Sequence, residues 1–271
     1  MAKKLSHKIL QGYAYVFIAY LLLPLAVMCG AAFNDSRFPT ILPWNGFTWR
    51  WFVDLYNDTT IWQATFNTIM VAFAVVALSV PIGTAGAILV NSLKGRSRAL
   101  LYATMIAPIL TPGAVIGIST LLFWYKFNVP AGLQLSVFAQ TSFIAAYVML
   151  MVLARLQSFD GGLEEAALDL GASHAQMLRR VLLPHLYPAI AAGAVLAFFQ
   201  SMENFNATQF TRGASTTLTV YVGSKVRTGI TPTIDALAVI LIGLTLVGVI
   251  TYEVRRRREQ ARLRLLEAEA N

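Results

Sequence analysis

The sequence predicts an all-α, polytopic membrane protein with six transmembrane helices. Of its 271 residues, 57% are hydrophobic and only 13% are charged, a balance too apolar for a soluble domain of this length. The apolar residues also gather into six runs, each long enough for the about 20 residues that an α-helix needs to cross a bilayer. These runs cover residues 13–33, 63–90, 99–124, 135–154, 186–207 and 234–254.

The net charge of +8 is distributed unevenly along the chain. With the N-terminus placed in the cytoplasm, fifteen of the 21 Lys and Arg residues fall in inside segments and six in outside segments. Membrane proteins keep an excess of these residues in the cytoplasm, so both termini and the polar stretch 155–185 are expected there. The cluster Arg255 to Arg258 is then interpreted as a lipid-headgroup anchor rather than a nucleic-acid site, and the basic tail, about 255–271, is expected to continue the sixth helix.

The first run, 13–33, is longer than the apolar core of a signal peptide, so it is interpreted as a retained helix. Its Cys29 is the only cysteine, which excludes an internal disulfide and a multi-cysteine metal site. The following stretch, 34–62, is rich in turn formers and tryptophan. Two interpretations stay open for it: an interfacial aromatic belt with a short helix, or a docking surface for an external protein.

The second and third runs are joined by a short basic turn around Gly95. Pro108 and Pro112 in the third run each remove an intrahelical hydrogen bond, so a bend is expected there. Gly113 and Gly117 follow at a spacing that lets another helix approach backbone to backbone. A pore-lining role and simple helix packing are equally consistent with this pattern.

The largest polar gap, 155–185, lies between the fourth and fifth runs. Residues 164–170 favour a short helix, Gly171 can adopt the left-handed conformation that ends it, and Ser173 can cap a second short helix. The segment 181–188 is expected to break that second helix before the fifth run begins.

The first of these short helices has a composition that suits contact with a partner protein. Ala166 and Ala167 give a face with little side-chain bulk, and negative charge surrounds that face at Glu164, Glu165 and Asp169. Many membrane proteins carry an acidic amphipathic helix at the bilayer surface, so composition leaves both interpretations open.

The spacing within this gap is more specific than its composition. A Glu-Ala-Ala triplet, a glycine, an aliphatic residue and a Leu-Pro pair occur at Glu165, Ala166, Ala167, Gly171, Val181, Leu183 and Pro184. This pattern resembles the cytoplasmic coupling loop of the membrane subunits of ABC importers. The resemblance implies the type I ABC importer permease fold and a role as one permease of a translocation path driven by ATP hydrolysis elsewhere.

The same resemblance implies the partners and the roles of individual residues. The chain is expected to assemble with a second, similar permease, an ATPase dimer and an external substrate-binding protein. Glu165 would pair with a basic residue of the ATPase, Ala166 and Ala167 would form the buried contact, and Gly171 would set the bend. ATP and Mg²⁺ would be bound by the ATPase, and no cofactor is expected in this chain.

Nothing in the sequence indicates catalysis within the chain. The Gly-x-x-x-x-Gly-Lys-Ser/Thr loop that cradles nucleotide phosphates does not occur. The three histidines, His7, His174 and His185, stand apart and form no set with carboxylates at metal-ligand spacing. No catalytic site and no metal site are therefore predicted, and membrane lipid rather than nucleic acid is the expected surrounding.

A wider resemblance concerns the substrate. The order of the six spans and the stretches 46–52, 155–160 and 201–203 look like the second permease of spermidine/putrescine importers. This similarity extends over nearly the full chain and implies a polyamine or a related small organic ion as the substrate.

Glu203 is the acid deepest within a predicted span, with Gln200, Asn204 and Asn206 nearby. An ionised side chain facing lipid costs several kcal/mol, so these residues are candidates for the substrate path. By helical rise from Pro188, Glu203 would lie roughly 22 Å up, near the outer end of the fifth run, where simple hydration would also account for it. Polyamine permeases tend to carry a second acid directly after this position, where this chain has Asn204.

The whole chain, 1–271, is interpreted as a single integral membrane domain. Two other functions stay open from the residues alone. A secondary transporter would need paired charges near the bilayer middle and an inverted repeat, and neither is visible. A membrane scaffold would have no transport role. Only the importer requires a separate ATPase bound through residues 161–185.

Overall fold

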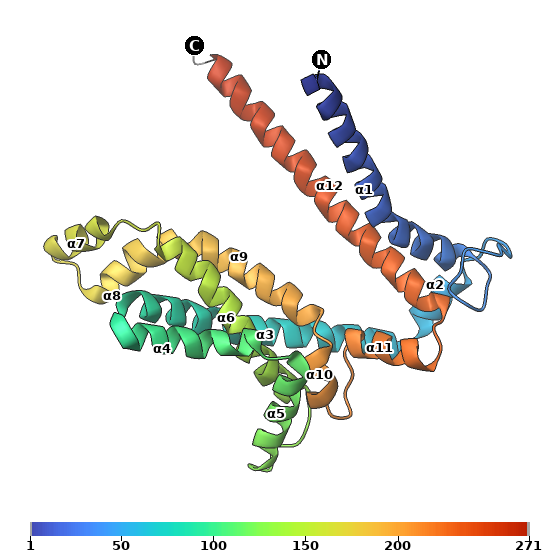
Figure 1. Cartoon of the computed structure of the whole chain (residues 1–271), viewed down its shortest axis with the longest axis horizontal. Coiled ribbons are helices and arrows are strands. Elements are labelled where there is room, and N and C mark those ends of the chain that lie inside the picture. Colours follow the sequence, from blue (N-terminus) through green and yellow to red (C-terminus); the bar gives the residue numbers. More distant parts are fainter. Residues whose placement is uncertain (1, 270–271) are drawn as a thin grey trace. The chain divides into compact units, whose positions relative to one another are not determined.

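The computed structural model describes residues 2–269, with side chains for residues 10–260. Within these residues all the regular elements are helices (Figure 1), as the sequence predicts. The contacts divide the chain into two compact units, one made of Met1–Thr59 with Lys225–Asn271 and the other of Thr60–Ser224. The interpretation of residues 1–271 as one membrane domain stays a prediction.

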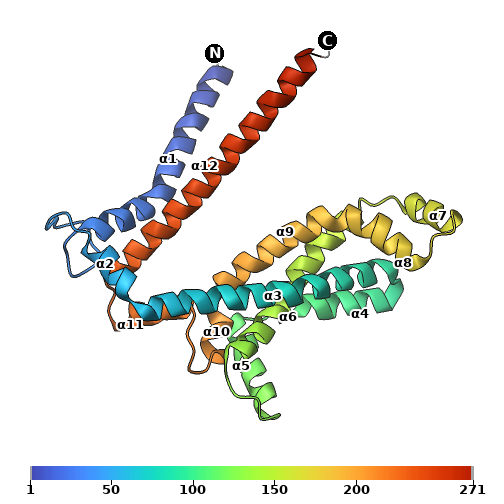
Figure 2. The same cartoon turned by 180° about the vertical axis from the view of Figure 1, so that it is seen from behind.

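The first unit holds α1 (Ala2–Phe33), α2 (Arg50–Asn57) and α12 (Pro232–Glu269). α12 packs along α1 and also contacts α2, and α1 and α12 lie side by side in Figure 1 and Figure 2. The basic tail expected over 255–271 continues α12 as far as Glu269. Its side chains beyond residue 260 lie outside the described residues.

The second unit is built on three long helices, α3 (Thr59–Ser92), α6 (Leu133–Leu156) and α9 (Leu183–Met202). Shorter helices complete it, and the last of them continues into the first unit. They are α4 (Gly95–Ile106), η1 (Ala107–Leu110), α5 (Gly113–Tyr125), α7 (Gly161–Asp169), α8 (His174–Met177), η2 (Leu178–Leu182), α10 (Asn206–Thr211) and α11 (Leu218–Thr228).

The core of the second unit forms where α6 packs against α3 and α9. Val148 and Met149 of α6 are fully buried in it. Gly83 of α3 lies so close to α6 that a Cβ atom there would be 2.5 Å from the carbonyl oxygen of Ala145. Gly193 of α9 is similarly close to α6, because a Cβ atom there would be 3.2 Å from Val148 Cγ1. Small residues at helix crossings allow this approach, which is typical of packing within a membrane.

The number of spans agrees with the sequence prediction. Within the described part of the chain, five helices are long and apolar enough to cross a membrane, and the bent pair formed by Gly95–Leu110 and Gly113–Tyr125 supplies the sixth if it counts as one span. The two parts of this pair are bent by 106°. Pro108 lies in the first turn of η1 and Pro112 directly precedes α5, so the prolines interrupt the helix where the sequence predicts a bend.

The fifth span begins earlier than the sequence predicts. One helix extends from His174 to Met202, with a π-helical turn at Leu178–Leu182, so the break predicted over 181–188 is wrong. Pro184 falls directly after the π turn, at the start of α9. The shifted hydrogen-bond register of a π turn accommodates the missing N–H of a proline there, and the helix continues.

The fifth span also ends earlier than predicted. α9 stops at Met202, the backbone of residues 203–205 is not helical, and α10 begins at Asn206. Asn204 accounts for this break. Its Oδ1 accepts hydrogen bonds from the backbone N–H groups of Ala207 (3.2 Å) and Thr208 (3.3 Å), so its side chain starts a new helix.

Candidate functional site

The first candidate site is the connection between α6 and α9, residues 157–182, which we call the connecting loop. It contains the two short helices that the sequence predicts, α7 and α8, which lie at one end of the second unit in Figure 1 and Figure 2. Asp160 caps the first of them, because its Oδ1 accepts a hydrogen bond from the N–H of Gly162 at 2.9 Å.

Gly171 ends α7 in the left-handed conformation, with φ of +82°. Its N–H donates to the carbonyl oxygen of Leu168 (2.9 Å), and the N–H of Ala172 donates to that of Ala167 (3.1 Å). These are the two hydrogen bonds of a Schellman motif, which satisfies the last carbonyl groups of a helix. A side chain at position 171 would be strained by this backbone conformation, so the bend at Gly171 is a property of the glycine itself.

α8 begins with a reciprocal cap. Gln176 N–H donates to Ser173 Oγ at 3.3 Å, and Ser173 N–H donates back to Gln176 Oε1 at 2.8 Å. This capping box satisfies two of the free N–H groups at the helix start. The cap that the sequence predicts at Ser173 is confirmed, and Gln176 is the partner that sequence reasoning missed.

The structure distributes the predicted coupling residues between two environments. Exposed positions are Glu165, Ala166, Asp169, Gly171 and Pro184, and half-buried positions are Glu164, Ala167, Val181 and Leu183. Ala167 packs against the core of its own unit. Of the two alanines, therefore, only Ala166 is fully presented to the surroundings.

A groove lies beside the Gly171 turn, with a volume of about 330 Å³. Its walls come from both short helices and from the π turn: Ala167, Leu170, Gly171, Ala172, Gln176, Met177, Arg180 and Val181. Leu170 is 90% exposed, although it is a large apolar side chain. Sequence reasoning missed Leu170 and Arg180, whose positions next to the groove depend on the turn at Gly171.

The connecting loop is tied to the helices on both sides of it. Arg155 at the end of α6 donates from Nε to the carbonyl oxygen of His185 in α9, at 3.2 Å. The rings of Phe159 and His185 meet edge to face, with 5.1 Å between their centroids. His185 is therefore half-buried between two elements rather than a simple surface residue.

The second candidate site surrounds the break at residues 203–205. The hydroxyl of Ser201 donates to Gln140 Oε1, and Gln140 Nε2 donates to Thr208 Oγ1 at 2.8 Å. Thr208 Oγ1 in turn donates to Asn204 Oδ1 at 3.2 Å. One side chain of α6 thus binds the last turn of α9 and the first turn of α10, on either side of the break.

These bonds place the break inside the span rather than at its end. Gln140 lies seven positions after Leu133, about 10 Å along the α6 axis. From Thr208, α10 returns along α6 toward its first turn, where Ser136 Oγ and Thr211 Oγ1 are 2.8 Å apart. Non-helical backbone at membrane depth occurs where it is enclosed by protein or lines a water-filled cavity. The helical rise counted from Pro188 holds up to Met202, the residue before Glu203, because α9 is helical that far; the chain turns back along α6 only after Glu203.

The break in the fifth span meets the break in the third. A Cβ atom on Gly113 would lie 3.0 Å from Asn206 Cβ, and one on Gly117 would lie 2.7 Å from the carbonyl oxygen of Ala207. The close backbone approach that the sequence predicts for this glycine pair is confirmed, and its partner is α10. Two interrupted helices therefore pack together at their interruptions.

The predicted path residues differ in how they are used. Glu203 and Asn206 are exposed, whereas Gln200 and Asn204 are half-buried. The side chain of Asn204 is engaged in capping α10. Sequence reasoning missed Gln140, although a glutamine in the middle of an apolar run is a signal that could have found it.

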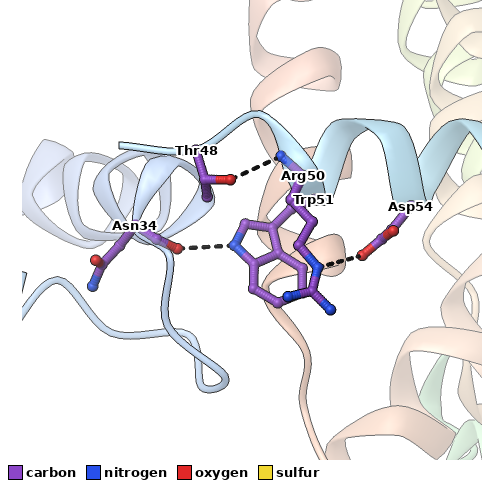
Figure 3. A network of polar contacts seen from close by, with 5 residues as sticks. All are labelled: Asn34, Thr48, Arg50, Trp51 and Asp54. Carbon is purple, nitrogen blue, oxygen red and sulfur yellow. Dashed lines mark hydrogen bonds and ion pairs between the residues drawn. The ribbon is translucent and has the colours of Figure 1, made fainter. Parts of the chain in front are cut away.

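The first unit contains a third organised polar site, in the stretch between α1 and α2. Asn34 is fully buried, and its carbonyl oxygen accepts a hydrogen bond from Trp51 Nε1 at 2.9 Å (Figure 3). Its side chain donates to the carbonyl oxygens of Thr40 and Pro43 and accepts from the N–H of Asn45. Trp51 is therefore an internal anchor of this stretch.

Aromatic rings also gather outside this anchor. Phe33 packs on Phe47, Trp49 and Phe52 with centroid distances of 5.1–5.3 Å. Phe47 and Trp49 stay exposed in this unit. An aromatic belt and a protein-docking surface both remain consistent with this arrangement.

The helical membrane fold and the connecting loop are those expected of one class of protein, the membrane-embedded permease component of an ABC importer, and comparison with known families establishes this class. Residues 79–260 match the model of the family described as binding-protein-dependent transport system inner membrane component. The chain belongs to this family. Its members are multi-pass, non-catalytic subunits, and the nucleotide is bound by a separate ATPase subunit. Membership of this family decides against the other two functions that the residues alone leave open, a secondary transporter and a membrane scaffold.

Characterised relatives align over almost the whole chain. The spermidine/putrescine transport system permease protein PotC of Haemophilus influenzae is 31% identical over 92% of this chain and 96% of its own length. PotC of Escherichia coli K12 is 32% identical, over 91% of this chain and 93% of its own. The putrescine transport system permease protein PotI of the same strain is also 32% identical, over 94% and 92%.

Solved structures support the fold. A bacterial ABC transporter involved in the import of the acidic polysaccharide alginate matches with a TM-score of 0.68 and 15% identity, over 94% of this chain and 97% of that one. The alginate transporter in complex with a periplasmic protein bound to an alginate pentasaccharide matches with a TM-score of 0.70 and 18% identity, over 92% of each chain.

Among the side chains that the structure describes, no group of three or more His, Cys, Asp or Glu could hold a metal ion.

Proposed function

We propose that this chain is one of two permeases in an importer of small organic cations, and that ATP hydrolysis in a partner ATPase moves it through the connecting loop. The observation that carries the coupling role is continuity. The exposed α7 face leads through the Gly171 turn into a helix that runs unbroken from His174 to Met202. A displacement of the loop therefore acts directly on a membrane-spanning helix.

The surface of the loop suits insertion into another protein. Glu165 and Ala166 are exposed on α7, and Leu170 extends from its end beside the groove. An apolar side chain next to a small alanine and a carboxylate gives a contact with an apolar centre and a charged rim. Glu165 pairs with a basic residue of the ATPase, and Leu170 adds an apolar anchor that the resemblance alone does not supply.

The substrate class rests on a separate argument. The relatives that are 31–32% identical are named as permeases for spermidine and putrescine. Glu203 is an exposed carboxylate at the interruption of the fifth span, with the amide of Asn206 exposed nearby in sequence. Discontinuous helices form many of the substrate sites in transporters. At such a break, the negative charge of a carboxylate favours a cationic substrate.

The charge distribution supports the orientation. The connecting loop and both termini lie in the cytoplasm of a bacterium, and the stretch between α1 and α2 lies outside, where a substrate-binding protein delivers its ligand. A second permease completes the path. A homologue is favoured over a second copy of this chain, because the resemblance is to the second of two permeases.

The coupling role is tested in the assembled transporter. Glu165→Lys is expected to leave membrane insertion intact and to abolish co-purification of the ATPase and uptake together, because the ion pair becomes a repulsion. Glu259→Lys makes the same change at an exposed acid of α12 and serves as the matched control. Normal uptake by Glu165→Lys with a normal amount of bound ATPase would remove the coupling role.

The substrate role is tested with Glu203→Gln, which keeps the shape of the side chain and removes its charge. Uptake is compared for a diamine, a triamine and an uncharged diol of similar length, each with its own binding-protein affinity measured. Loss of diamine and triamine transport with unchanged ATPase association is expected. If the variant transports both amines at the normal rate, Glu203 has no direct part in the path.

A further inference from the structure

Gln140 is a buried polar side chain of the interrupted-span region, and its hydrogen bonds join α6 to both α9 and α10. It is 1% exposed and lies within the apolar span of α6. Its amide group uses both ends: Oε1 accepts from Ser201 in α9, and Nε2 donates to Thr208 in α10. The two bonds reach residues 61 and 68 positions away in the sequence.

The hydrogen bonds around Gln140 form a directed chain. Ser201 donates to Gln140, Gln140 donates to Thr208, and Thr208 donates to the side chain of Asn204. Each hydroxyl and amide group in this series of hydrogen bonds has a consistent donor or acceptor role. Hydrogen bonds connected in this way strengthen one another in a low-dielectric interior. Both ends of the break at residues 203–205 are thereby held at one level of α6.

The backbone of the break has a further contact with the same region. The carbonyl oxygen of Asn204 accepts a hydrogen bond from Thr219 Oγ1 at 3.1 Å. Glu203 itself is exposed and lies between Ser201 and Asn204, the two positions that the network holds. The direction in which Glu203 is presented therefore depends on residues that Gln140 fixes.

We infer that Gln140 is a positioning residue for transport: it clamps α9 to α10 across the break and so sets where the Glu203 carboxylate lies. This inference rests on the proposed role of Glu203 in the substrate path. Gln140 does not touch the substrate, because it is buried behind the break. Its role is to keep a short non-helical segment in one conformation at membrane depth.

The first test compares Gln140→Leu with Thr141→Val in the complete transporter. Thr141 is the neighbouring buried polar residue, 7% exposed, and its Oγ1 has no hydrogen-bond partner among the described residues, so its loss is expected to be neutral. Gln140→Leu is expected to lower the maximal uptake rate about tenfold, the equivalent of one buried hydrogen bond, with normal ATPase association. Uptake equal to that of Thr141→Val would overturn the inference.

A second variant separates positioning from stability, because Gln140→Leu leaves two hydroxyls without their partner. The triple variant Gln140→Leu/Ser201→Ala/Thr208→Val removes the partners as well, so no polar group is stranded and assembly is expected to be normal. If Gln140 positions the break, uptake stays about tenfold low in this variant. Restored uptake would show that the network serves stability alone.

A third measurement reports the conformation of the break without transport. Cys29→Ser removes the only cysteine of the chain, and Glu203→Cys then gives one thiol at the break. Its rate of labelling by a small cationic thiol reagent is expected to change about tenfold when Gln140→Leu is added, as for loss of one buried hydrogen bond. Unchanged labelling contradicts the inference, even if Glu203 is needed for uptake. Changed labelling together with normal uptake by Glu203→Gln upholds the clamp and removes only the substrate role.

Discussion

Gly117 of α5 lies against Ala207 of α10 so closely that a Cβ atom at Gly117 would be 2.7 Å from the Ala207 carbonyl oxygen. The two helices belong to the two interrupted spans. The glycine therefore brings the two interrupted spans into contact.

The first prediction concerns this approach. Gly117→Ala is expected to destabilise the permease by about 1–3 kcal/mol, because backbone atoms cannot move aside as a flexible side chain can. Thermal unfolding of the purified transporter measures the change. Gly243→Ala on α12 is the control, since a Cβ there meets nothing within 4 Å in the described residues. Equal unfolding temperatures for the two variants would show that the contact is looser than the structure has it.

The second prediction concerns the turn of the connecting loop. Gly171 and Gly161 both face open space, but only Gly171 has a positive φ, of +82°. Gly171→Ala is expected to strain the backbone by about 1–2 kcal/mol and to weaken ATPase association, whereas Gly161→Ala does neither. Gly171→Asp is expected to abolish uptake while insertion into the membrane stays intact. Co-purified ATPase per permease is the readout, and equal amounts for the two alanine variants would count against a strained turn.

The third prediction concerns the cap of α8. Ser173→Ala and Gln176→Ala each remove one half of the reciprocal capping box, and each is expected to cost about 1 kcal/mol of local stability. The double variant is expected to cost less than the two single costs together, because both changes break the same unit. Hydrogen exchange of the amides of residues 174–177 in the assembled complex measures these values. Strict additivity would indicate two independent bonds.

The fourth prediction concerns the stretch between α1 and α2. Trp51→Phe keeps the apolar ring but removes the indole donor seen in Figure 3, and the buried carbonyl oxygen of Asn34 keeps only the hydrogen bond from the Ser36 N–H at 2.8 Å, at an expected cost of about 0.5–1.5 kcal/mol. Trp44→Phe, at a tryptophan that is 50% exposed, is the control and is expected to have no effect. Unfolding temperatures decide between them, and a Trp51→Phe protein as stable as Trp44→Phe would mean that the Ser36 N–H alone satisfies the Asn34 carbonyl oxygen.

Much of the connecting loop could be predicted because its structure is local. The turn at Gly171 and the cap at Ser173 depend on residues within a few positions of them. The number of spans could be predicted for a related reason: the length of an apolar run is a property of the sequence itself. The continuation of α8 into α9 could not be predicted. A π turn directly before α9 accommodates Pro184, and no local sequence pattern indicates a π turn.

The sequence by itself therefore determined the all-helical membrane fold, the two short helices of the connecting loop and the spacing that indicates an importer permease. Only the tertiary structure decided where the fifth span is interrupted, how the chain turns back along α6 after Glu203 and what Gln140 binds. The physical reason is distance along the chain: a buried amide must find partners, and those of Gln140 lie on two other helices. Such pairings become visible only when the helices are packed.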